Sequence, residues 1–254
     1  APTYDPAPVS DGTYYLRVDT EDEAGNRAGW TTLFTLKYDE TDPTKPDRPV
    51  SSGCSAADGV WQDTCAAPSF TWSGAGDGES GIAGYYVYWG QDADGTSTDF
   101  QISPAHAPDA VSSGTYYLRV DTEDGAGNRA GWKTLFELKY DGLVPDSPDR
   151  PADPQCAATD GVWQSACNAP DFIWAGAGDS HSGLAGYYVY WGPDADGTST
   201  DFQASAAYSP GSVPDGTYYL RVDTEDALGH RAGWVTLFEF KYDDATPGSP
   251  DRPA

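Results

Sequence analysis

The sequence predicts an all-β chain of tandem β-sandwiches, because it contains an internal repeat, a two-residue alternation within each repeat and frequent turn residues. An eleven-residue segment, Gly-Thr-Tyr-Tyr-Leu-Arg-Val-Asp-Thr-Glu-Asp, begins at Gly12, Gly114 and Gly216, which gives a period of 102 residues. A repeat of this length is the size of one ordinary domain. The 254 residues therefore hold about two and a half copies.

The repeat divides the chain into units and linkers. Residues 1–39 match the second half of an Ig-sized unit, residues 50–141 and 152–243 are full units, and the proline-rich linkers are residues 40–49, 142–151 and 244–254. Proline restricts φ and removes backbone donors, so we expect these short linkers to be stiff. A chain that begins within one unit and ends where the next would start is expected to be a segment of a longer array.

Apolar residues within a unit alternate with a period of two, as in half-buried strands. The pattern places inward Tyr85, Val87, Trp89, Tyr116, Leu118, Val120, Thr122, Phe136, Leu138 and Tyr140. It places outward Tyr86, Tyr88, Tyr117, Arg119, Asp121, Leu135 and Lys139. Glycine-rich turns separate these runs and we find no amphipathic helix, which favours antiparallel strands in a sandwich.

Three motifs follow one another in the first full unit: Phe-Thr-Trp ending at Trp72, Gly-Tyr-Tyr-Val-Tyr-Trp beginning at Gly84, and Gly-Thr-Tyr-Tyr-Leu-Arg-Val beginning at Gly114. This order, after a proline-rich start and before a Gly-Asn turn and a last strand, resembles fibronectin type III and related bacterial Ig-like modules of secreted surface proteins. The resemblance covers both full units and the half unit. It implies an Ig-like β-sandwich, although fibronectin type III modules usually lack a cysteine pair.

The four cysteines form two pairs with ten residues between the members, Cys54 with Cys65 and Cys156 with Cys167. The repeated spacing favours one disulfide per full unit, and so an oxidising, extracellular or cell-surface location. A zinc site is not expected, because a unit offers two cysteines and no recurring histidine.

The composition argues against several classes of function. With 40 acidic and 14 basic residues the net charge is −26, so we expect no nucleic-acid partner, which would need Lys/Arg clusters. No apolar run is long enough for a membrane-spanning helix. The histidines, His106, His181 and His230, are replaced by other residues in the other units. We therefore interpret them as surface substitutions, and we expect no catalytic set and no enzyme activity.

Acidic turns give the one candidate cofactor, calcium. An Asp-x-Asp-Gly turn occurs at the same position in both full units. Its alternating carboxylates are like part of a calcium loop, although the EF-hand spacing is absent. End-to-end stacking of units would bring this turn toward acidic residues at the opposite pole of the next unit. The candidate ligands are Asp92, Asp94, Asp99, Asp179, Asp194, Asp196, Asp201 and Asp226. The alternative is a solvated acidic turn.

The outward aromatic face, repeated in each unit, is a candidate contact surface. Its residues are Tyr86, Tyr88, Tyr117, Arg119, Tyr188, Tyr190, Tyr219 and Arg221, with Trp61 and Trp163 on the cysteine loops. Tyrosine and arginine suit protein contacts or sugar stacking. The candidate partners are copies of the chain, neighbouring repeats and glycans. The alternatives are a cross-strand ladder in which Arg119 pairs with Glu137, and tryptophans packed on their own or a neighbouring unit.

These features together predict a structural repeat segment of a large extracellular fibre, stalk or cell-surface adhesin-like protein, able to assemble with itself into filaments. The alternative is a glycan-binding or accessory spacer module of a larger secreted enzyme. Near-identical units favour a scaffold over a binding module. Strand exchange between chains is a further route to filaments, but nothing in the sequence marks a separate donor strand.

Overall fold

The computed structural model of the chain describes residues 3–52, 54–151 and 156–250. Contacts divide the chain into two compact units: unit 1 is Ala1–Val60 with Thr64–Lys139, and unit 2 is Trp61–Asp63 with Tyr140–Ala254. The described residues form strands, turns and bends, which confirms the predicted all-β class. In this part of the chain there is no helix that could cross a membrane.

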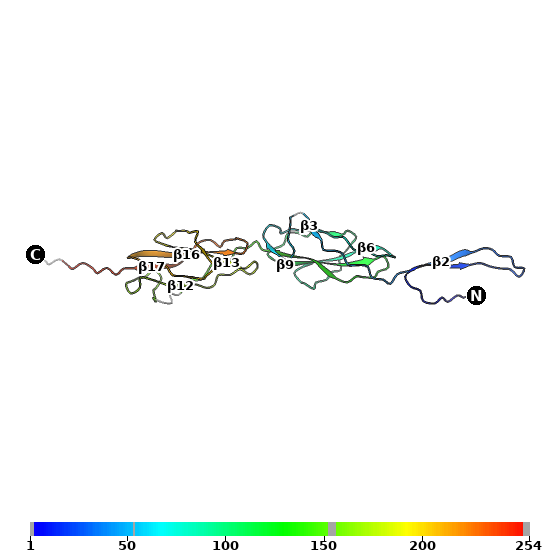
Figure 1. The fold of residues 1–254 in the computed structure, drawn as a ribbon, viewed down its shortest axis with the longest axis horizontal. Helices are drawn as coiled ribbons and strands as arrows, with labels where there is room; N and C mark the ends of the chain where they lie inside the picture. The colour runs from blue at the N-terminus through cyan, green and yellow to red at the C-terminus, as the bar shows by residue number, and fades with distance from the viewer. Residues whose placement is uncertain (1–2, 53, 152–155, 251–254) are drawn as a thin grey trace. The chain divides into compact units, whose positions relative to one another are not determined.

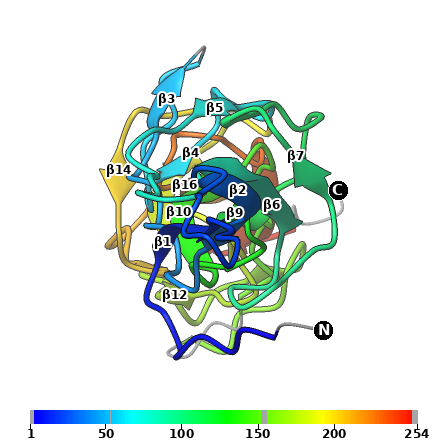
Figure 2. The same ribbon diagram turned by 90° about the vertical axis from the view of Figure 1, so that its right-hand side faces the viewer.

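Unit 1 begins with a hairpin of β1 (Gly12–Val18) and β2 (Thr31–Tyr38), paired antiparallel as a two-stranded sheet. Strands β3 to β10 form a full sandwich, called module A. One sheet consists of β3 (Val50–Ser52), β5 (Ser69–Thr71) and β8 (Ala105–His106). The other has the order β4-β10-β9-β6-β7, with β4 (Trp61–Gln62), β6 (Ile82–Gly90), β7 (Phe100–Gln101), β9 (Gly114–Asp124) and β10 (Lys133–Tyr140). In both views β3 and β5 lie on one side of β6 and β9, as two layers (Figure 1, Figure 2).

Unit 2 contains module B, formed by β11 to β17. A short sheet pairs β12 (Phe172–Ile173) with β15 (Ala207–Tyr208). The main sheet has the order β11-β17-β16-β13-β14, with β11 (Trp163–Gln164), β13 (Leu184–Gly192), β14 (Phe202–Gln203), β16 (Gly216–Asp226) and β17 (Val235–Tyr242). This is the strand order of module A, so the repeat in sequence is also a repeat in structure.

The core of each module lies between its two sheets. Module B buries Phe172, Trp174, Tyr187, Val189, Leu220, Val222, Leu237, Phe238, Phe240 and Tyr242. The ring of Phe172 lies 5.2 Å from that of Phe238, and in module A Phe70 lies 5.0 Å from Phe136. Burying each side chain of this kind contributes about 1.5–3 kcal/mol. The inward positions predicted from the alternation are confirmed for Tyr85, Val87, Leu118, Val120, Thr122, Phe136 and Leu138.

One outward prediction on the last strand is wrong. Leu135 is 0% exposed, because the last strand carries a β-bulge. In module B the pairing of β16 with β17 shifts register between Leu220 and Arg221, which leaves Leu237, the equivalent of Leu135, as the extra residue. A bulge breaks the two-residue alternation, so both Leu237 and Phe238 enter the core.

Both cysteine pairs are disulfide-bonded, as the spacing predicted. Cys54 is bonded to Cys65 and Cys156 to Cys167, and the Cα atoms of each pair are 5.6 Å apart. Each bond closes a short loop that carries β4 or β11. In the chain-entropy treatment such a loop closure is worth about 3 kcal/mol.

The first and second proline-rich linkers pack on the modules and are not free spacers. In the first linker Pro43 and Pro46 are buried, and the backbone N–H groups of Thr44 and Asp47 each donate to a carbonyl oxygen of residues 73–76 at 2.8 Å. The second linker repeats this arrangement, with two buried prolines and two backbone hydrogen bonds of 2.7 and 2.8 Å to residues 175–178. These segments are therefore held on the module that follows them in the sequence.

Candidate functional site

Three aspartates come together in each unit. Cluster 1 consists of Asp39, Asp77 and Asp124, and cluster 2 consists of Asp141, Asp179 and Asp226. In each cluster one carboxylate oxygen per residue lies within 4.8 Å of the other two. Calcium binds oxygen ligands at about 2.3–2.6 Å, so two ligands on opposite sides of one ion are about 5 Å apart. The spacing of the carboxylates therefore fits a shared divalent cation.

Tight turns fix the carboxylates of cluster 1. Asp124 ends β9, and its Oδ1 accepts hydrogen bonds of 2.7–2.9 Å from the backbone N–H groups of residues 126–128. Asp77 precedes β6, and its Oδ2 accepts hydrogen bonds of 2.7–3.1 Å from residues 79–81. Asp39 follows β2, and its Oδ2 accepts a hydrogen bond of 3.1 Å from the backbone of Ser80. The turns themselves thus bring the three side chains to one place.

Hydrogen bonds keep one buried carboxylate of each cluster ionised at neutral pH. Asp124 is 1% exposed and Asp141 is 0% exposed. Burial alone would raise the pKa of Asp124, but hydrogen bonds from Asn128, Ala126 and Gly127 outweigh it and lower the pKa below its ordinary value. Burial likewise raises the pKa of Asp141, and hydrogen bonds from Ser182 and Leu143 together with the charge of His181 bring it below its ordinary value. Each cluster therefore holds close negative charges.

Two histidines lie beside the carboxylates of cluster 2, whereas no histidine pairs with cluster 1 among the described residues. His230 Nδ1 lies 2.7 Å from Asp226 Oδ2, and this hydrogen bond raises the pKa of His230. His181 Nδ1 lies 4.0 Å from Asp141 Oδ1. The position of His230 is held in module A by Asn128, and no ion pair among the described residues involves cluster 1. Both histidines are half-buried, and each has an acidic partner within its unit.

The acidic residues predicted as calcium ligands lie in two kinds of place. Asp179 and Asp226 lie together in cluster 2. The others lie in exposed turns, and neither cluster of described carboxylates includes them: Asp92, Asp94, Asp99, Asp194, Asp196 and Asp201. The candidate ligands predicted from the sequence did not include Asp39, Asp77, Asp124 and Asp141. The signal for Asp39 and Asp141 is the tripeptide Lys-Tyr-Asp, which ends each copy of the repeat.

The turn between β6 and β7 lies on the predicted aromatic face of module A. Tyr88 Oη accepts a hydrogen bond of 3.1 Å from the backbone N–H of Asp92. Arg119 Nη1 donates to the carbonyl oxygen of Gly95 at 2.6 Å, whereas Glu137 pairs with Lys139 at 3.5 Å. The ladder in which Arg119 pairs with Glu137 is therefore not the arrangement found. Tyr88 and Arg119 hold the turn against their own sheet.

Tyr86 on the same face is covered by side chains of its own module. The Arg129 guanidinium lies 3.8 Å from the centre of the Tyr86 ring, and Phe100 approaches the ring at 5.1 Å. Arg129 also pairs with Asp121 at 2.7 Å. Asp121 lies opposite Tyr86 on this outward face, as predicted, and it is 3% exposed because Arg129 and Tyr86 cover it.

Module B repeats these contacts on its own face. Tyr190 Oη accepts from the backbone of Asp194 at 3.2 Å, and Arg221 Nη1 donates to Gly197 O at 2.7 Å. Arg231 lies 3.9 Å from the centre of the Tyr188 ring. Tyr117 and Tyr219 are half-buried, and Tyr219 Oη donates to Glu239 Oε1 at 3.4 Å.

The two cysteine-loop tryptophans differ in exposure. The ring of Trp61 belongs to unit 2 and lies 5.7 Å from the ring of His181 in an edge-to-face contact. Trp163, at the equivalent position, is 56% exposed. The alternative in which the cysteine-loop tryptophan packs against other residues therefore describes Trp61.

Solved structures of fibronectin type III modules are similar to the chain. The fibronectin(III)-like modules of Clostridium thermocellum CbhA share 13% sequence identity with it, over 77% of this chain and 96% of that one, with a TM-score of 0.32. The FN1–FN3 domains of chicken CNTN1 share 11% identity, over 89% of this chain and 77% of that one, with a TM-score of 0.26. No family model matches the chain, and no curated protein matches it.

Proposed function

We propose that this chain is a structural repeat segment of an extracellular fibre, stalk or adhesin-like surface protein. Its modules give mechanical continuity along the polypeptide rather than acting on a substrate. The observation that carries the proposal is the attachment of the first and second linkers to the modules that follow them, each by two buried prolines and two backbone hydrogen bonds. A tether held in this way has little freedom to swing, because its backbone donors and proline rings already have partners.

Two further features support the same role. The disulfide in each full module limits how far that part of the chain can extend, and it suits an oxidising location outside the cell. The net charge of −26 favours repulsion between neighbouring chains. Calcium at the carboxylate clusters remains a prediction, which is tested below.

Distance measurements between the modules test the stiffness. Spin labels carried on unnatural amino acids at Thr98 and Thr200, both exposed, should give one narrow distance distribution in the intact chain. Replacing the buried linker prolines, Pro145→Gly and Pro148→Gly, should broaden it. Pro193→Gln is the matched control, because Pro193 is exposed and module A carries glutamine there. A broad distribution in the unmodified chain would refute the mechanical reading.

Microscopy of the native assembly tests the location. An antibody against the chain should label long beaded filaments in negative stain outside the cell. Short rods attached to a compact catalytic domain would favour the accessory-module alternative instead. The tyrosine face gives that alternative little support, since Tyr86, Tyr88 and Arg119 already have partners within their module.

A further inference from the structure

Each full module carries a loop of ten residues that its disulfide closes. Loop A is residues 55–64, and loop B is residues 157–166. Both loops bury little apolar surface: Val60 of loop A is 55% exposed, and Val162 and Trp163 of loop B are 51% and 56% exposed. Ordering ten residues costs conformational entropy that so few apolar contacts do not offset. The disulfide is therefore the main constraint on each loop.

Backbone strain lies beside the first cysteine of each loop. Ser55 and Ala157 have φ of 55° and 50°, and in the described part of the chain they are the non-glycine residues with positive φ. A residue with a Cβ seldom adopts such values, because the Cβ crowds the backbone. The conformation persists where the surrounding structure imposes it. The disulfide is the covalent constraint next to both residues, so opening it lets them relax.

Loop A holds the end of the first linker. Asp58 of this loop pairs through Oδ2 with Arg48 of the linker. Its Oδ1 accepts a hydrogen bond of 2.7 Å from the backbone N–H of Glu137 in β10. The backbone N–H of Gly59 donates to the carbonyl oxygen of Glu137 at 2.8 Å. One aspartate of the loop therefore joins the linker to the last strand of the module.

Loop B holds the second linker in the same way. Asp160 pairs with Arg150 of the linker, and its Oδ1 accepts a hydrogen bond of 2.7 Å from the backbone N–H of Glu239 in β17. Asp149, the residue before Arg150, is the one whose backbone N–H attaches this linker to the module. Because both repeats make these contacts, the position of the loop helps to fix the position of the linker.

We propose that each disulfide loop is a redox-dependent strap, which fixes the preceding linker when its cysteine pair is oxidised and releases it when the pair is reduced. A low-molecular-weight disulfide supplies the oxidation by thiol–disulfide exchange. The two thiols of a loop lose two protons and two electrons and form one S–S bond, while the S–S bond of the reagent breaks and takes them up as two thiols. The inference rests on the proposed function: the chain is flexible in a reducing compartment and stiffens in an oxidising one.

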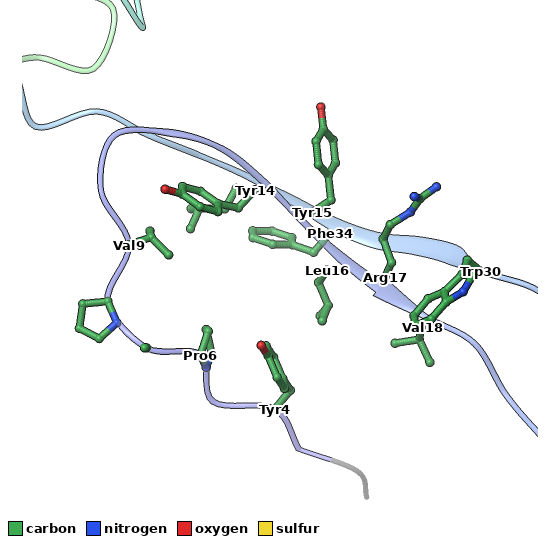
Figure 3. Close-up of a pocket in the computed structure, with 13 residues that line it drawn as sticks. Tyr4, Pro6, Val9, Tyr14, Tyr15, Leu16, Arg17, Val18, Trp30 and Phe34 are labelled. Atoms are coloured by element: carbon green, nitrogen blue, oxygen red, sulfur yellow. The ribbon is translucent and has the colours of Figure 1, made fainter.

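The β1–β2 hairpin supplies an internal reference for the test, because no cysteine lies in it or in the segment before it. Tyr4 and Pro6 of that segment face Leu16 and Phe34 of the hairpin across a cavity of about 990 Å³ (Figure 3). Leu16 and Phe34 lie opposite each other in the pairing of β1 with β2. Amides in this pairing therefore report changes that are unrelated to the two loops.

Hydrogen exchange in the full chain tests the strap. The readouts are the backbone amides of Asp47 and Asp149, which donate to Ser73 and Ala175 at 2.8 Å. Reduction by a dithiol should speed exchange at both amides about tenfold or more, because the linkers then open locally. Reoxidation by the low-molecular-weight disulfide should restore the slow rates. Amides of the β1–β2 pairing should not respond.

Removing one disulfide at a time shows which strap acts on which linker. Cys156→Ala with Cys167→Ala should speed exchange at Asp149 about tenfold or more and leave Asp47 unchanged. Loss of the loop A disulfide should do the reverse, so each variant is the control for the other.

Asp160→Asn opens the strap with the disulfide intact, so it tests the proposal even where a module without its disulfide unfolds. The amide oxygen still accepts from Glu239, but the charge that pairs with Arg150 is gone, and exchange at Asp149 should speed about three- to fivefold. Asp196→Asn is the matched control, because Asp196 is exposed and lies in the turn after β13. In the chain without the loop B disulfide, Asp160→Asn should add nothing further.

Two results would overturn the strap. One is exchange at Asp149 that responds neither to reduction nor to Asp160→Asn. The other is full additivity of Asp160→Asn and loss of the loop B disulfide, because loop and linker would then be independent. Exchange rates report on linker attachment, and the distance distribution between the modules reports on stiffness. Unchanged exchange with a narrow distribution therefore overturns the strap alone, whereas a broad distribution in the oxidised chain overturns the proposed function.

Discussion

A methyl group added at the turn on the aromatic face measures how firmly that turn is held. In Gly95→Ala the new Cβ would lie 2.5 Å from Tyr88 Oη, well inside the ordinary contact distance of about 3.5 Å. The ring must move by about 1 Å, and overpacking of this kind costs about 1–3 kcal/mol. The hydrogen bond from Asp92 to Tyr88 Oη, worth about 1 kcal/mol, is lost as well. We therefore expect a loss of about 2–4 kcal/mol per module.

Thermal unfolding followed by circular dichroism detects this loss. Gly95→Ala combined with Gly197→Ala, which faces Tyr190 in the same way, should lower the melting temperature by about 10–20 °C. The matched control is Gly78→Ala with Gly178→Ala, where a Cβ meets nothing within 4 Å and φ is negative. The control should change stability by at most about 0.5 kcal/mol.

The result bears directly on the use of the tyrosine face. If Gly95→Ala and Gly197→Ala leave the melting temperature where the control leaves it, the tyrosines are not packed against the turns. They would then be free for an outside partner, as the contact-surface interpretation requires. Tyr88→Ser in the Gly95→Ala background gives a second check, since removing the ring removes the clash. The two changes should then cost less together than the sum of their separate effects.

Three further predictions follow from single features of the modules. Cys54→Ala with Cys65→Ala should lower the unfolding free energy of module A by about 3 kcal/mol, measured by urea denaturation. A loss below about 1 kcal/mol would contradict the expectation that the disulfide lowers the entropy of the unfolded chain. Burial lowers the pKa of His106, so the unfolded chain binds its proton at higher pH and stability should fall as the pH drops below about 6.5. His106→Tyr introduces the residue that module B carries as Tyr208, and it should remove that part of the pH dependence. Equal melting curves for parent and variant at pH 7.5 and at pH 5 would contradict this role of His106. Added calcium should raise the melting temperature more than sodium chloride of equal ionic strength does. Equal shifts would show that neither cluster binds calcium.

Much of the fold could be predicted because the repeat shows each pattern more than once. The two-residue alternation gave the inward residues of β6 and β9, whose pairing is regular over most of its length. It failed at Leu135, because a bulge adds a residue without leaving a mark in the hydrophobic pattern. It placed Asp121 on the correct face but did not predict its burial, because the residue that covers it, Arg129, lies beyond the end of the strand.

The carboxylate clusters could be predicted only in part, because each joins residues that are distant in the sequence. The backbone of Ser182 donates to Asp141, 41 residues earlier, and the backbone of Ser80 donates to Asp39 over the same separation. Local turn chemistry identified Asp179 and Asp226 as acidic turn residues, but it carries no information on which turns meet. The burial of the linker prolines could not be predicted for the same reason. Their spacing predicted stiffness, whereas their burial depends on a segment about 30 residues further along the chain.

The difference between the hairpin and the modules shows that the segment opposite the sheet, rather than the residue type, decides whether these side chains are available to a partner. Phe34 and Phe136 occupy equivalent positions in nearly identical strands, yet one is 59% exposed and the other 4%. On the other face of the sheet, arginines pack on the tyrosine rings and hold the turn that follows β6 or β13, in both full modules. A closed module therefore leaves few groups on this face unpaired among its described residues.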